Sequence, residues 1–247
     1  MKGYYQFTLL QQEPRLIHGI FDRSFGNISL FHGQKQAVER NKEKIAQALG
    51  IDKKNFYSVK QTHSNRLQVI TNKKGLRGAE SEADGLITNQ KGIFLTIKTA
   101  DCFPVLFYDR RQEVVAAIHV GWRGAMAKIF LNALLKLMVE FKSQPKDLLV
   151  GIGPGIGEKC FQHQHLLQEK LTEWRKYIKI DEDGWRRLAL ARFIKDQLIS
   201  LGVREENLEE MGICTCCSRC FFSHFRSLQT GEKEGRFASV IGLKEKE

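Results

Sequence analysis

Two mostly apolar runs near the middle of the chain constrain its fold more than any other sequence feature. Residues 103–108 and 113–120 have strand character, and the polar residues 109–112 join them over a length suited to a four-residue hairpin loop. Neither run alternates apolar with polar residues, so both strands should be buried. The sequence therefore predicts a buried β-hairpin within a β-sheet core.

The remaining segments predict helices and further strands around this hairpin. Strands are predicted at residues 56–60, 67–71, 85–88, 93–99 and 148–152. Amphipathic helices are predicted at residues 35–49, 123–142 and 185–201, with a further helix starting near Glu158. Because strands and helices do not alternate strictly, we expect an α+β (mixed α/β) fold rather than a doubly wound parallel sheet. No repeat or linker composition divides the chain, so we expect a single domain over residues 1–247.

The net charge favours anionic ligands. The chain carries 39 Lys and Arg residues against 28 Asp and Glu residues, a formal charge of +11, which favours phosphate, nucleotides or nucleic acid. The basic residues are dispersed, and the short basic clusters at residues 73–77 and 142–146 lack interleaved aromatic residues. We therefore expect a small anion such as phosphate as a partner, and no nucleic acid.

Hydropathy and cysteine content predict a cytoplasmic protein with no membrane partner. No apolar run approaches the roughly eighteen residues of a membrane span, and residues 1–13 lack the apolar region and cleavage site of a signal peptide. Six cysteines in such a chain should be mostly reduced. Their spacing then indicates metal or catalytic chemistry rather than a disulfide framework.

His63 and Cys102 stand in polar turns next to predicted strands, where active-site residues gather. A single histidine in a loop is more often a solvated side chain than a ligand. Cys102 is open to three interpretations: a nucleophile, a metal thiolate or an inert buried thiol. Its neighbour Asp101 is open to two, since it could orient a ligand or transfer a proton, or it could cap a turn.

His119 lies at the end of the second hairpin strand and gives the strongest local signal. Glycines at positions 121 and 124 permit a sharp turn into the following helix. Arg123 supplies a cation, and the backbone amides around Gly124 at the helix start favour an anion. We predict that Arg123 and Gly124 contact substrate or phosphate, the alternative being a core histidine before an ordinary helix.

Together, His63, Cys102 and His119 supply two imidazoles and one thiolate. Three such ligands suit tetrahedral zinc with water or substrate in the fourth position. An open position indicates catalysis, because zinc acidifies a bound water. Copper also binds such ligands, but this set makes at most one site and no multicopper cluster. We therefore predict zinc at these ligands, with catalytic roles for Cys102 and Asp101.

Two further motifs give weaker signals. The glycine-rich segment 151–157 matches neither a G-x-G-x-x-G fingerprint nor a Walker A motif. Its glycines either let the backbone approach a ligand or another strand closely, or form a purely structural turn. The segment 214–220 has overlapping C-x-x-C spacings through Cys214, Cys216, Cys217 and Cys220. Since no second spaced pair completes a four-ligand set, we interpret these cysteines as reduced thiols or an adventitious metal site rather than a structural zinc site.

Several motifs, taken in order, resemble those of a known family. They are Gln61-Thr62-His63, Glu82-Ala83-Asp84-Gly85-Leu86-Ile87-Thr88, Thr99-Ala100-Asp101-Cys102, His119-Val120-Gly121-Trp122-Arg123-Gly124, Gly151-Ile152-Gly153-Pro154-Gly155-Ile156-Gly157, Cys214-Thr215, Phe221-Phe222-Ser223 and Gly235-Arg236-Phe237. The set resembles the polyphenol oxidase or laccase-like family of YfiH and YlmD type, also called purine nucleoside phosphorylases. The resemblance implies zinc ligands at His63, Cys102 and His119. It also implies phosphorolysis of adenosine, inosine and methylthioadenosine, and deamination of adenosine.

Two functions of other classes remain open. In the first, Cys102 is the nucleophile of a metal-free cysteine hydrolase, with His119 or His63 as base and amides or cell-wall fragments as substrate. In the second, the chain is a metal-dependent interaction module without turnover. Metal content and turnover separate both from a zinc nucleoside enzyme.

Overall fold

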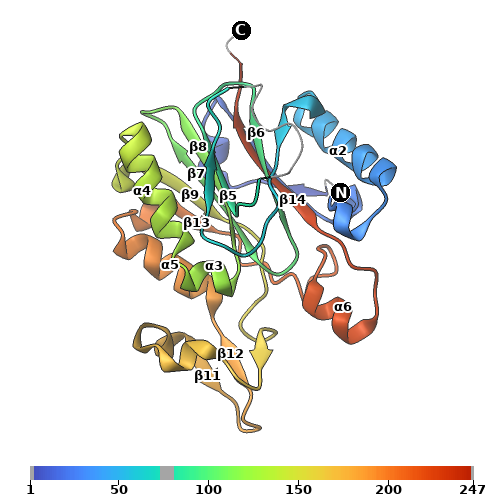
Figure 1. Ribbon diagram of the computed structural model, residues 1–247, viewed down its shortest axis with the longest axis vertical. Coiled ribbons are helices and arrows are strands. Elements are labelled where there is room, and N and C mark those ends of the chain that lie inside the picture. The colour runs from blue at the N-terminus through green and yellow to red at the C-terminus, as the bar shows by residue number, and fades with distance from the viewer. Residues whose placement is uncertain (1–2, 73–80, 246–247) are drawn as a thin grey trace.

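Two β-sheets packed face to face form the centre of the fold in the computed structural model, which describes residues 3–72 and 81–245 (Figure 1). The five-stranded sheet has the order β1 (Tyr4–Tyr5), β2 (Leu16–Phe21), β14 (Phe237–Leu243), β6 (Phe94–Thr99) and β3 (Phe56–Tyr57). The six-stranded sheet has the order β13 (Leu208–Glu210), β9 (Leu148–Ile152), β7 (Phe103–Asp109), β8 (Val114–Val120), β5 (Gly85–Thr88) and β4 (Leu67–Val69). The predicted basic cluster at residues 73–77 lies outside the described residues.

The predicted hairpin is confirmed as β7 and β8, two antiparallel neighbours in the middle of the six-stranded sheet. Every residue of both strands is buried. Val105 and Phe107 pack on the outer side of the sheet, whereas Leu106 and Tyr108 pack between the two sheets. Both faces are therefore covered, which explains why the sequence does not alternate here.

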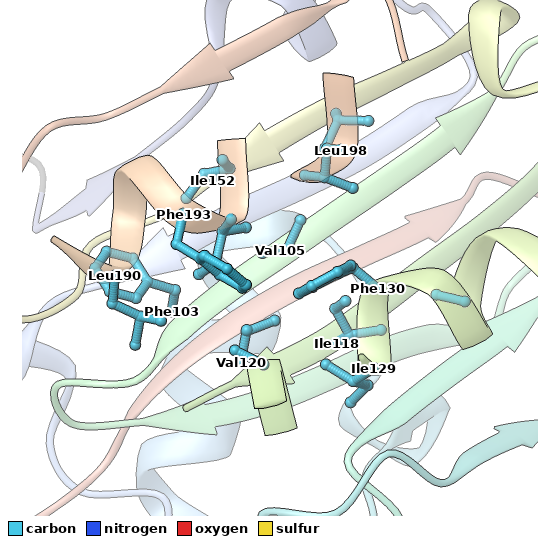
Figure 2. Close-up of a cluster of buried hydrophobic side chains, with 14 of the residues drawn as sticks. Phe103, Val105, Ile118, Val120, Ile129, Phe130, Ile152, Leu190, Phe193 and Leu198 are labelled. Carbon is cyan, nitrogen blue, oxygen red and sulfur yellow. The ribbon is translucent and has the colours of Figure 1, made fainter. Parts of the chain in front are cut away.

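Helices cover the outer face of each sheet. Helix α2 (Lys35–Leu49) packs on the five-stranded sheet, and α4 (Ile129–Phe141) and α5 (Leu190–Ser200) pack on the six-stranded sheet (Figure 1). Figure 2 shows Phe130 of α4 and Phe193 of α5 packed over strand residues such as Val105. The layers run helix, sheet, sheet, helix, and the predicted α+β class is confirmed.

Helix α2 has the bounds that the sequence predicts. It buries Val38, Ile45 and Ala46 on one face and ends at Gly50. Gly50 has φ +66°, a left-handed conformation in which its amide donates to the carbonyls of Ala46 and Gln47. Within residues 3–72 and 81–245, no helix combines the length and apolar composition needed to cross a bilayer.

The single helix predicted over residues 123–142 is wrong in one respect, because the chain forms two helices there. Helix α3 (Trp122–Met126) stops before Lys128, which adopts φ +59°, and α4 begins at the next residue. The side-chain amide of Asn65 donates to the carbonyl of Ala127 at 2.8 Å. A side chain from a distant turn thus donates a hydrogen bond to the Ala127 carbonyl at the break between the two helices. The spacing of apolar residues in the sequence does not indicate this contact.

Two other helix predictions need correction. The chain near Glu158 forms a turn and not a helix, and it continues into β10 (Gln162–His163). The helix predicted from residue 185 begins at Leu190, because β12 (Arg186–Leu188) pairs with β10 and with β11 (Ile178–Ile180) in a small sheet. Pairing with partners elsewhere in the chain outweighs the local helical pattern in both places.

The buried imidazole of His18 makes the fold sensitive to acid. His18 lies in β2, and its Nε2 atom accepts a hydrogen bond from the backbone amide of Phe7 at 2.9 Å. Burial lowers the pKa of His18 from its ordinary value of 6.5 to about 4. The folded state thus binds a proton less readily than the unfolded chain, so the stabilising contribution is complete above pH 6.5 and is lost as the pH falls toward 4.

We expect His18 alone to lower the free energy of unfolding by about 3 kcal/mol between these two pH values, at about 1.4 kcal/mol per pKa unit. Urea unfolding midpoints measured across this range provide the test. His18→Gln retains an acceptor for the Phe7 amide but does not bind a proton in this range, so its midpoint should vary less with pH. Parallel profiles for wild type and variant would contradict the prediction.

Candidate metal centre

Three separate chain segments bring His63, Cys102 and His119 together. Their donor nitrogen and sulfur atoms all lie within 4.8 Å of one another, and the two imidazole rings are 4.8 Å apart between centroids. His119 is buried, Cys102 is half-buried and His63 is exposed. The cluster therefore reaches the surface on the His63 side, where a substrate can approach.

Strand pairing places two of the three residues. In the β7–β8 ladder Pro104 pairs with His119, so Cys102 lies just before the strand that borders His119. His119 follows Val115 and Ala117 on the same face of β8, the face directed toward the other sheet. Cys102 and His119 thus meet where the two sheets adjoin.

A buried carboxylate, Asp84, fixes the turn that carries His63. Its oxygens accept hydrogen bonds from the backbone amides of Thr62, His63 and Ser64 at 3.1, 2.9 and 2.6 Å. These bonds hold His63 at φ +60°, a left-handed conformation that a histidine otherwise adopts rarely. Asp84 precedes β5 and is fully buried.

The same carboxylate orients His119. Oδ1 of Asp84 lies 2.8 Å from Nδ1 of His119. Burial raises the pKa of Asp84, but hydrogen bonds from His119 and Ser64 outweigh burial and hold that pKa well below its usual range. Since an ionised carboxylate only accepts, Nδ1 must carry the proton. Nε2 of His119 is then directed away from Asp84, as in carboxylate–histidine–metal arrangements.

Cys102 and His119 also interact electrostatically. Burial raises the pKa of the Cys102 thiol, but the charge of His119 and hydrogen bonds with both imidazoles outweigh this and lower the pKa to about 6. Burial lowers the pKa of His119, while the Cys102 thiolate and the bond to Asp84 raise it to about 9. The protein thus stabilises a thiolate at Cys102, the form that binds metals or attacks electrophiles.

Asp101 anchors the turn that presents Cys102. Its backbone has φ +83°, and its carboxylate accepts hydrogen bonds at 2.6 Å from the hydroxyl of Thr215 and from the amide of Phe225. Its carbonyl accepts from the amide of Ile156 at 2.7 Å. These contacts match the turn-capping alternative, and the catalytic role predicted for Asp101 remains a prediction.

Gly121 allows the chain to pass close to the sulfur of Cys102. A Cβ atom at position 121 would lie 2.7 Å from Sγ of Cys102 and 3.1 Å from Cδ2 of His63. No side chain fits at that distance without displacing a candidate ligand. The sequence pattern predicted a sharp turn here, and the structure adds that the turn closes over the thiol.

The predicted phosphate-binding residues lie on the turn after His119. Arg123 is exposed on α3, and its guanidinium carbon lies 4.3 Å from the centroid of the Trp122 ring. Gly124 is buried, and a Cβ atom there would lie 3.3 Å from the carbonyl oxygen of Ser64 in the His63 turn. Gly124 thus lies against the His63 turn, and contact of either residue with phosphate remains a prediction.

Two residues with roles in the structure carry no local sequence signal. Asp84 stands out in the sequence only as part of a motif, because nothing local shows that its carboxylate contacts the His63 turn and His119. Cys160 is not among the ligands that the sequence predicts, yet its sulfur lies with those of Cys214 and Cys217 in a second cluster whose donor atoms are within 4.8 Å of one another. Only tertiary contacts reveal the surroundings of either residue.

The glycine-rich segment 151–157, which begins in β9, passes close to β7, in agreement with one of the alternatives that the sequence left open. A Cβ atom at Gly155 would lie 2.4 Å from the ring of Phe103, and one at Gly153 would lie 2.7 Å from Cγ of Pro104. Gly155 forms an isolated parallel bridge with Cys214. The segment thus packs against β7 while joining the cysteine-rich loop.

Relatives with similar sequences carry the name purine nucleoside phosphorylase. YlmD of Bacillus subtilis is 29% identical over 229 residues, which cover 87% of this chain and 80% of YlmD. A Bacteroides thetaiotaomicron relative is 35% identical over 163 residues, or 64% of this chain and 60% of that protein. Mouse LACC1 is 26% identical over 254 residues, or 93% of this chain and 56% of LACC1. The chain thus spans less than two thirds of the last two proteins.

Solved structures agree with the fold, and a family model agrees with the sequence. The Bacillus licheniformis hypothetical protein YfiH has a TM-score of 0.86 at 28% identity, covering 99% of this chain and 97% of YfiH. YlmD of Geobacillus stearothermophilus, at 22% identity and a TM-score of 0.85, shares the fold over 99% of this chain and 100% of that one. The model of the multi-copper polyphenol oxidoreductase laccase family matches residues 20–244. The chain therefore belongs to that laccase-like family, to which the sequence motifs had pointed.

Proposed function

We propose that this protein is a zinc-dependent purine nucleoside enzyme that uses His63, Cys102 and His119 as metal ligands. The observation that carries the proposal is the convergence of these three donors, with His119 oriented by Asp84. Relatives named purine nucleoside phosphorylase support the substrate class. Adenosine, inosine and methylthioadenosine are the proposed substrates, with phosphate as the second. We place the activity in the cytoplasm, where thiolates stay reduced.

The donor set fits zinc. Two imidazoles and one thiolate occupy three positions of a tetrahedral site and leave the fourth open. The bond between Asp84 and Nδ1 of His119 leaves Nε2 for the metal, and the low pKa of Cys102 provides a thiolate near neutral pH. Zinc would supply a Lewis acid at the open position. Copper also binds His and Cys donors, so metal identity belongs in the first measurement.

The neighbouring residues have distinct proposed roles. Arg123, exposed on the turn that follows His119, binds phosphate, and the turn around Gly124 brings backbone close to the His63 segment. Asp101 acts as a positioning residue, since Thr215 and Phe225 both donate to its carboxylate. In phosphorolysis a phosphate oxygen bonds to C1′ of the ribose as the bond from C1′ to the purine nitrogen breaks, and the base leaves with a proton.

The experiment begins with protein purified without a metal-binding tag. Zinc and copper per chain are measured, and adenosine or inosine is incubated with and without phosphate. We expect free base and ribose 1-phosphate only when phosphate is present, and inosine from adenosine without it if deamination also occurs. His63→Ala, Cys102→Ala and His119→Ala should lose turnover, whereas Cys220→Ser should retain it. Nucleoside turnover that persists after complete metal removal would overturn the proposal.

A metal-free cysteine hydrolase is the second candidate, favoured by one observation: the sulfur of Cys102 lies within 4.8 Å of a ring nitrogen of His119. The pKa of Cys102 is lowered to about 6, with burial opposing and the neighbouring His119 charge promoting the shift. Such a pair resembles the thiolate–imidazole arrangement of cysteine nucleophiles. The hydrolase function predicts protein without metal, activity on amides that iodoacetamide abolishes, and activity that survives His63→Ala with His119 as base.

An interaction module predicts bound metal without turnover on any of these substrates.

A further inference from the structure

A second group of thiols lies outside the centre described above. The sulfurs of Cys160, Cys214 and Cys217 all lie within 4.8 Å of one another, and those of Cys160 and Cys217 are 3.2 Å apart. Cys160 belongs to the turn after the glycine-rich segment, and Cys214 and Cys217 belong to the loop that follows β13. Two chain segments far apart in sequence therefore supply three sulfur donors to one point.

The backbone holds these segments together independently of the thiols. The amide of Gly155 donates to the carbonyl of Ile213 at 3.2 Å, and the amide of Thr215 donates to the carbonyl of Gly155 at 3.0 Å. This bridge sets Cys214 beside the turn that carries Cys160. The positions of the sulfurs thus follow from the fold, and the site is organised before any ligand binds.

Backbone amides also donate to one of the sulfurs. Sγ of Cys214 accepts from the amide of Gly157 at 3.1 Å and from the amide of Cys217 at 3.5 Å. Amide donors of this kind orient and stabilise the thiolates that ligate metals. A Cβ atom at Gly157 would lie 3.2 Å from the same sulfur, so glycine permits the approach.

The arrangement suits a tetrahedral thiolate site. With Zn–S bonds of about 2.3 Å, two sulfurs of a tetrahedron lie roughly 3.8 Å apart, which is within the spread of the cluster. A disulfide would join two sulfurs at about 2 Å and leave the third, with its amide donors, unused. The thiol of Cys216 also contacts that of Cys160 and is a candidate donor for a fourth position.

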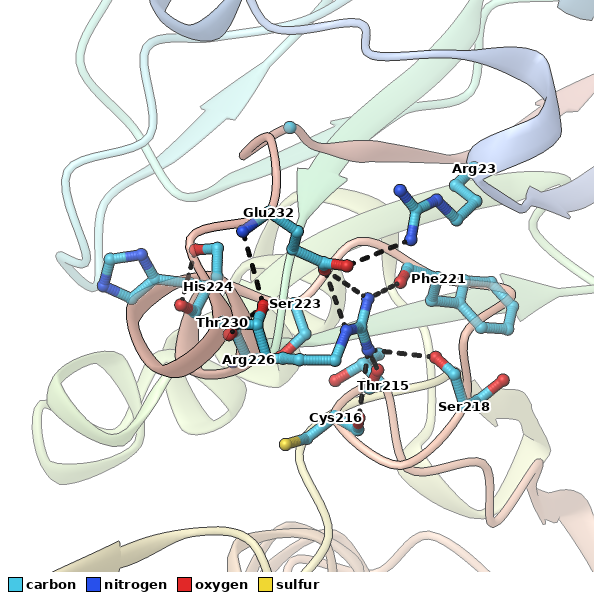
Figure 3. Close-up of polar contacts among 12 residues, drawn as sticks. Arg23, Thr215, Cys216, Ser218, Phe221, Ser223, His224, Arg226, Thr230 and Glu232 are labelled. Carbon is cyan, nitrogen blue, oxygen red and sulfur yellow. Dashed lines mark hydrogen bonds and ion pairs between the residues drawn. The ribbon is translucent and has the colours of Figure 1, made fainter.

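We propose that Cys160, Cys214 and Cys217 bind one zinc ion at a structural site separate from the His63-Cys102-His119 centre. The ion joins the turn at Cys160 to the loop that carries Thr215, whose hydroxyl donates to Asp101 next to Cys102. Figure 3 shows how this loop is held from its other side, with the carbonyl of Cys216 bonded to Arg226 and its sulfur directed away from that guanidinium. Zinc at this site would thereby stabilise the loop that carries Thr215, and through it the His63-Cys102-His119 centre, without contacting substrate.

Metal counting on purified protein tests the proposal. Protein prepared in reducing buffer without a metal-binding tag should contain two zinc ions per chain, one at each centre. His63→Ala should retain one, and Cys160→Ser, Cys214→Ser and Cys217→Ser should each also retain one. Cys220→Ser, a change in the same loop but outside the cluster, should retain two. These variants distinguish failure of this proposal from failure of the proposed function, which concerns the ion lost in His63→Ala.

A second measurement keeps the test decisive if the serine variants fold poorly. Cobalt bound to the His63→Ala protein, whose second cluster is intact, should give the intense charge-transfer absorption of a site with several thiolates. Loss of all zinc in His63→Ala, or a cobalt spectrum without thiolate bands, would overturn the proposal. So would four free thiols in place of six in protein denatured after the reductant has been removed, with the missing pair at Cys160 and Cys217.

Discussion

Replacing Asp84 with asparagine should weaken metal binding about 10- to 100-fold and destabilise the protein by about 3–5 kcal/mol. The replacement has the same size, but each carboxylate oxygen already accepts at least two hydrogen bonds. An NH2 group in place of either oxygen would face hydrogen-bond donors and could accept from none of them. The His63 turn and the His119 ring would therefore lose hydrogen bonds that hold them in place. Competition with a chelator of known affinity measures the first effect, and urea unfolding of metal-free protein measures the second.

Asp109→Asn is the matched control for this change. Asp109 is also a buried aspartate, and it accepts from the amides of Arg111 and Gln112 in the hairpin loop, at the opposite end of β7 from Cys102. It should lower stability without changing metal affinity. Equal metal affinity in wild type and Asp84→Asn would show that Asp84 does not orient the ligands.

Replacing Arg226 with methionine should destabilise the protein by about 3–5 kcal/mol. The buried guanidinium donates to four backbone carbonyls, those of Thr215, Cys216, Ser218 and Phe221 (Figure 3). It also forms an ion pair with Glu232. Methionine fills similar volume but leaves these acceptors without their donor. Urea unfolding measures the loss, and hydrogen exchange should show protection lost first over residues 214–221.

Arg226→Lys and Arg175→Met are the controls. A lysine ammonium supplies charge without the planar fork, so it should recover only part of the lost stability. Arg175 is exposed on the 3₁₀-helix Thr172–Tyr177, and its replacement by methionine should change stability by less than about 0.5 kcal/mol. Full recovery of stability in Arg226→Lys would show that the positive charge, and not the planar guanidinium, stabilises the loop over residues 214–221.

The elements that the sequence predicts correctly are those whose pattern of apolar residues lies within one segment. The buried hairpin and helix α2 follow from runs and periodicity within single segments, and the structure has both. The break at Lys128 and the strand at residues 186–188 depend on contacts with Asn65 and with β10 and β11, which no window of sequence contains. When a segment pairs with a partner elsewhere in the chain, that pairing can outweigh the secondary structure that the segment favours locally.

The residues of the candidate metal centre and its surroundings also differ in whether the local sequence indicates their role. The sequence singles out His63, Cys102 and His119 because donor residues at strand ends and turns are typical of active sites, and the structure brings these three together. Asp84, Arg226 and Cys160 carried no such signal, since an aspartate before a strand, an arginine in a helix and an isolated cysteine are ordinary residues. Their importance comes from burial and from distant partners, which the fold alone reveals.

The chain crosses between the two sheets at Asp101, from β6 in one to β7 in the other, and Cys102 is the next residue. The His63 turn likewise lies between β3 and β4, which belong to different sheets. We therefore expect the complete set of three donors to form only when the two sheets dock. An ion bound there would stabilise the native state more than the folding transition state. We therefore expect its main effect on lifetime: metal should slow unfolding and lengthen resistance to proteolysis, while the rate of folding should stay that of the metal-free chain.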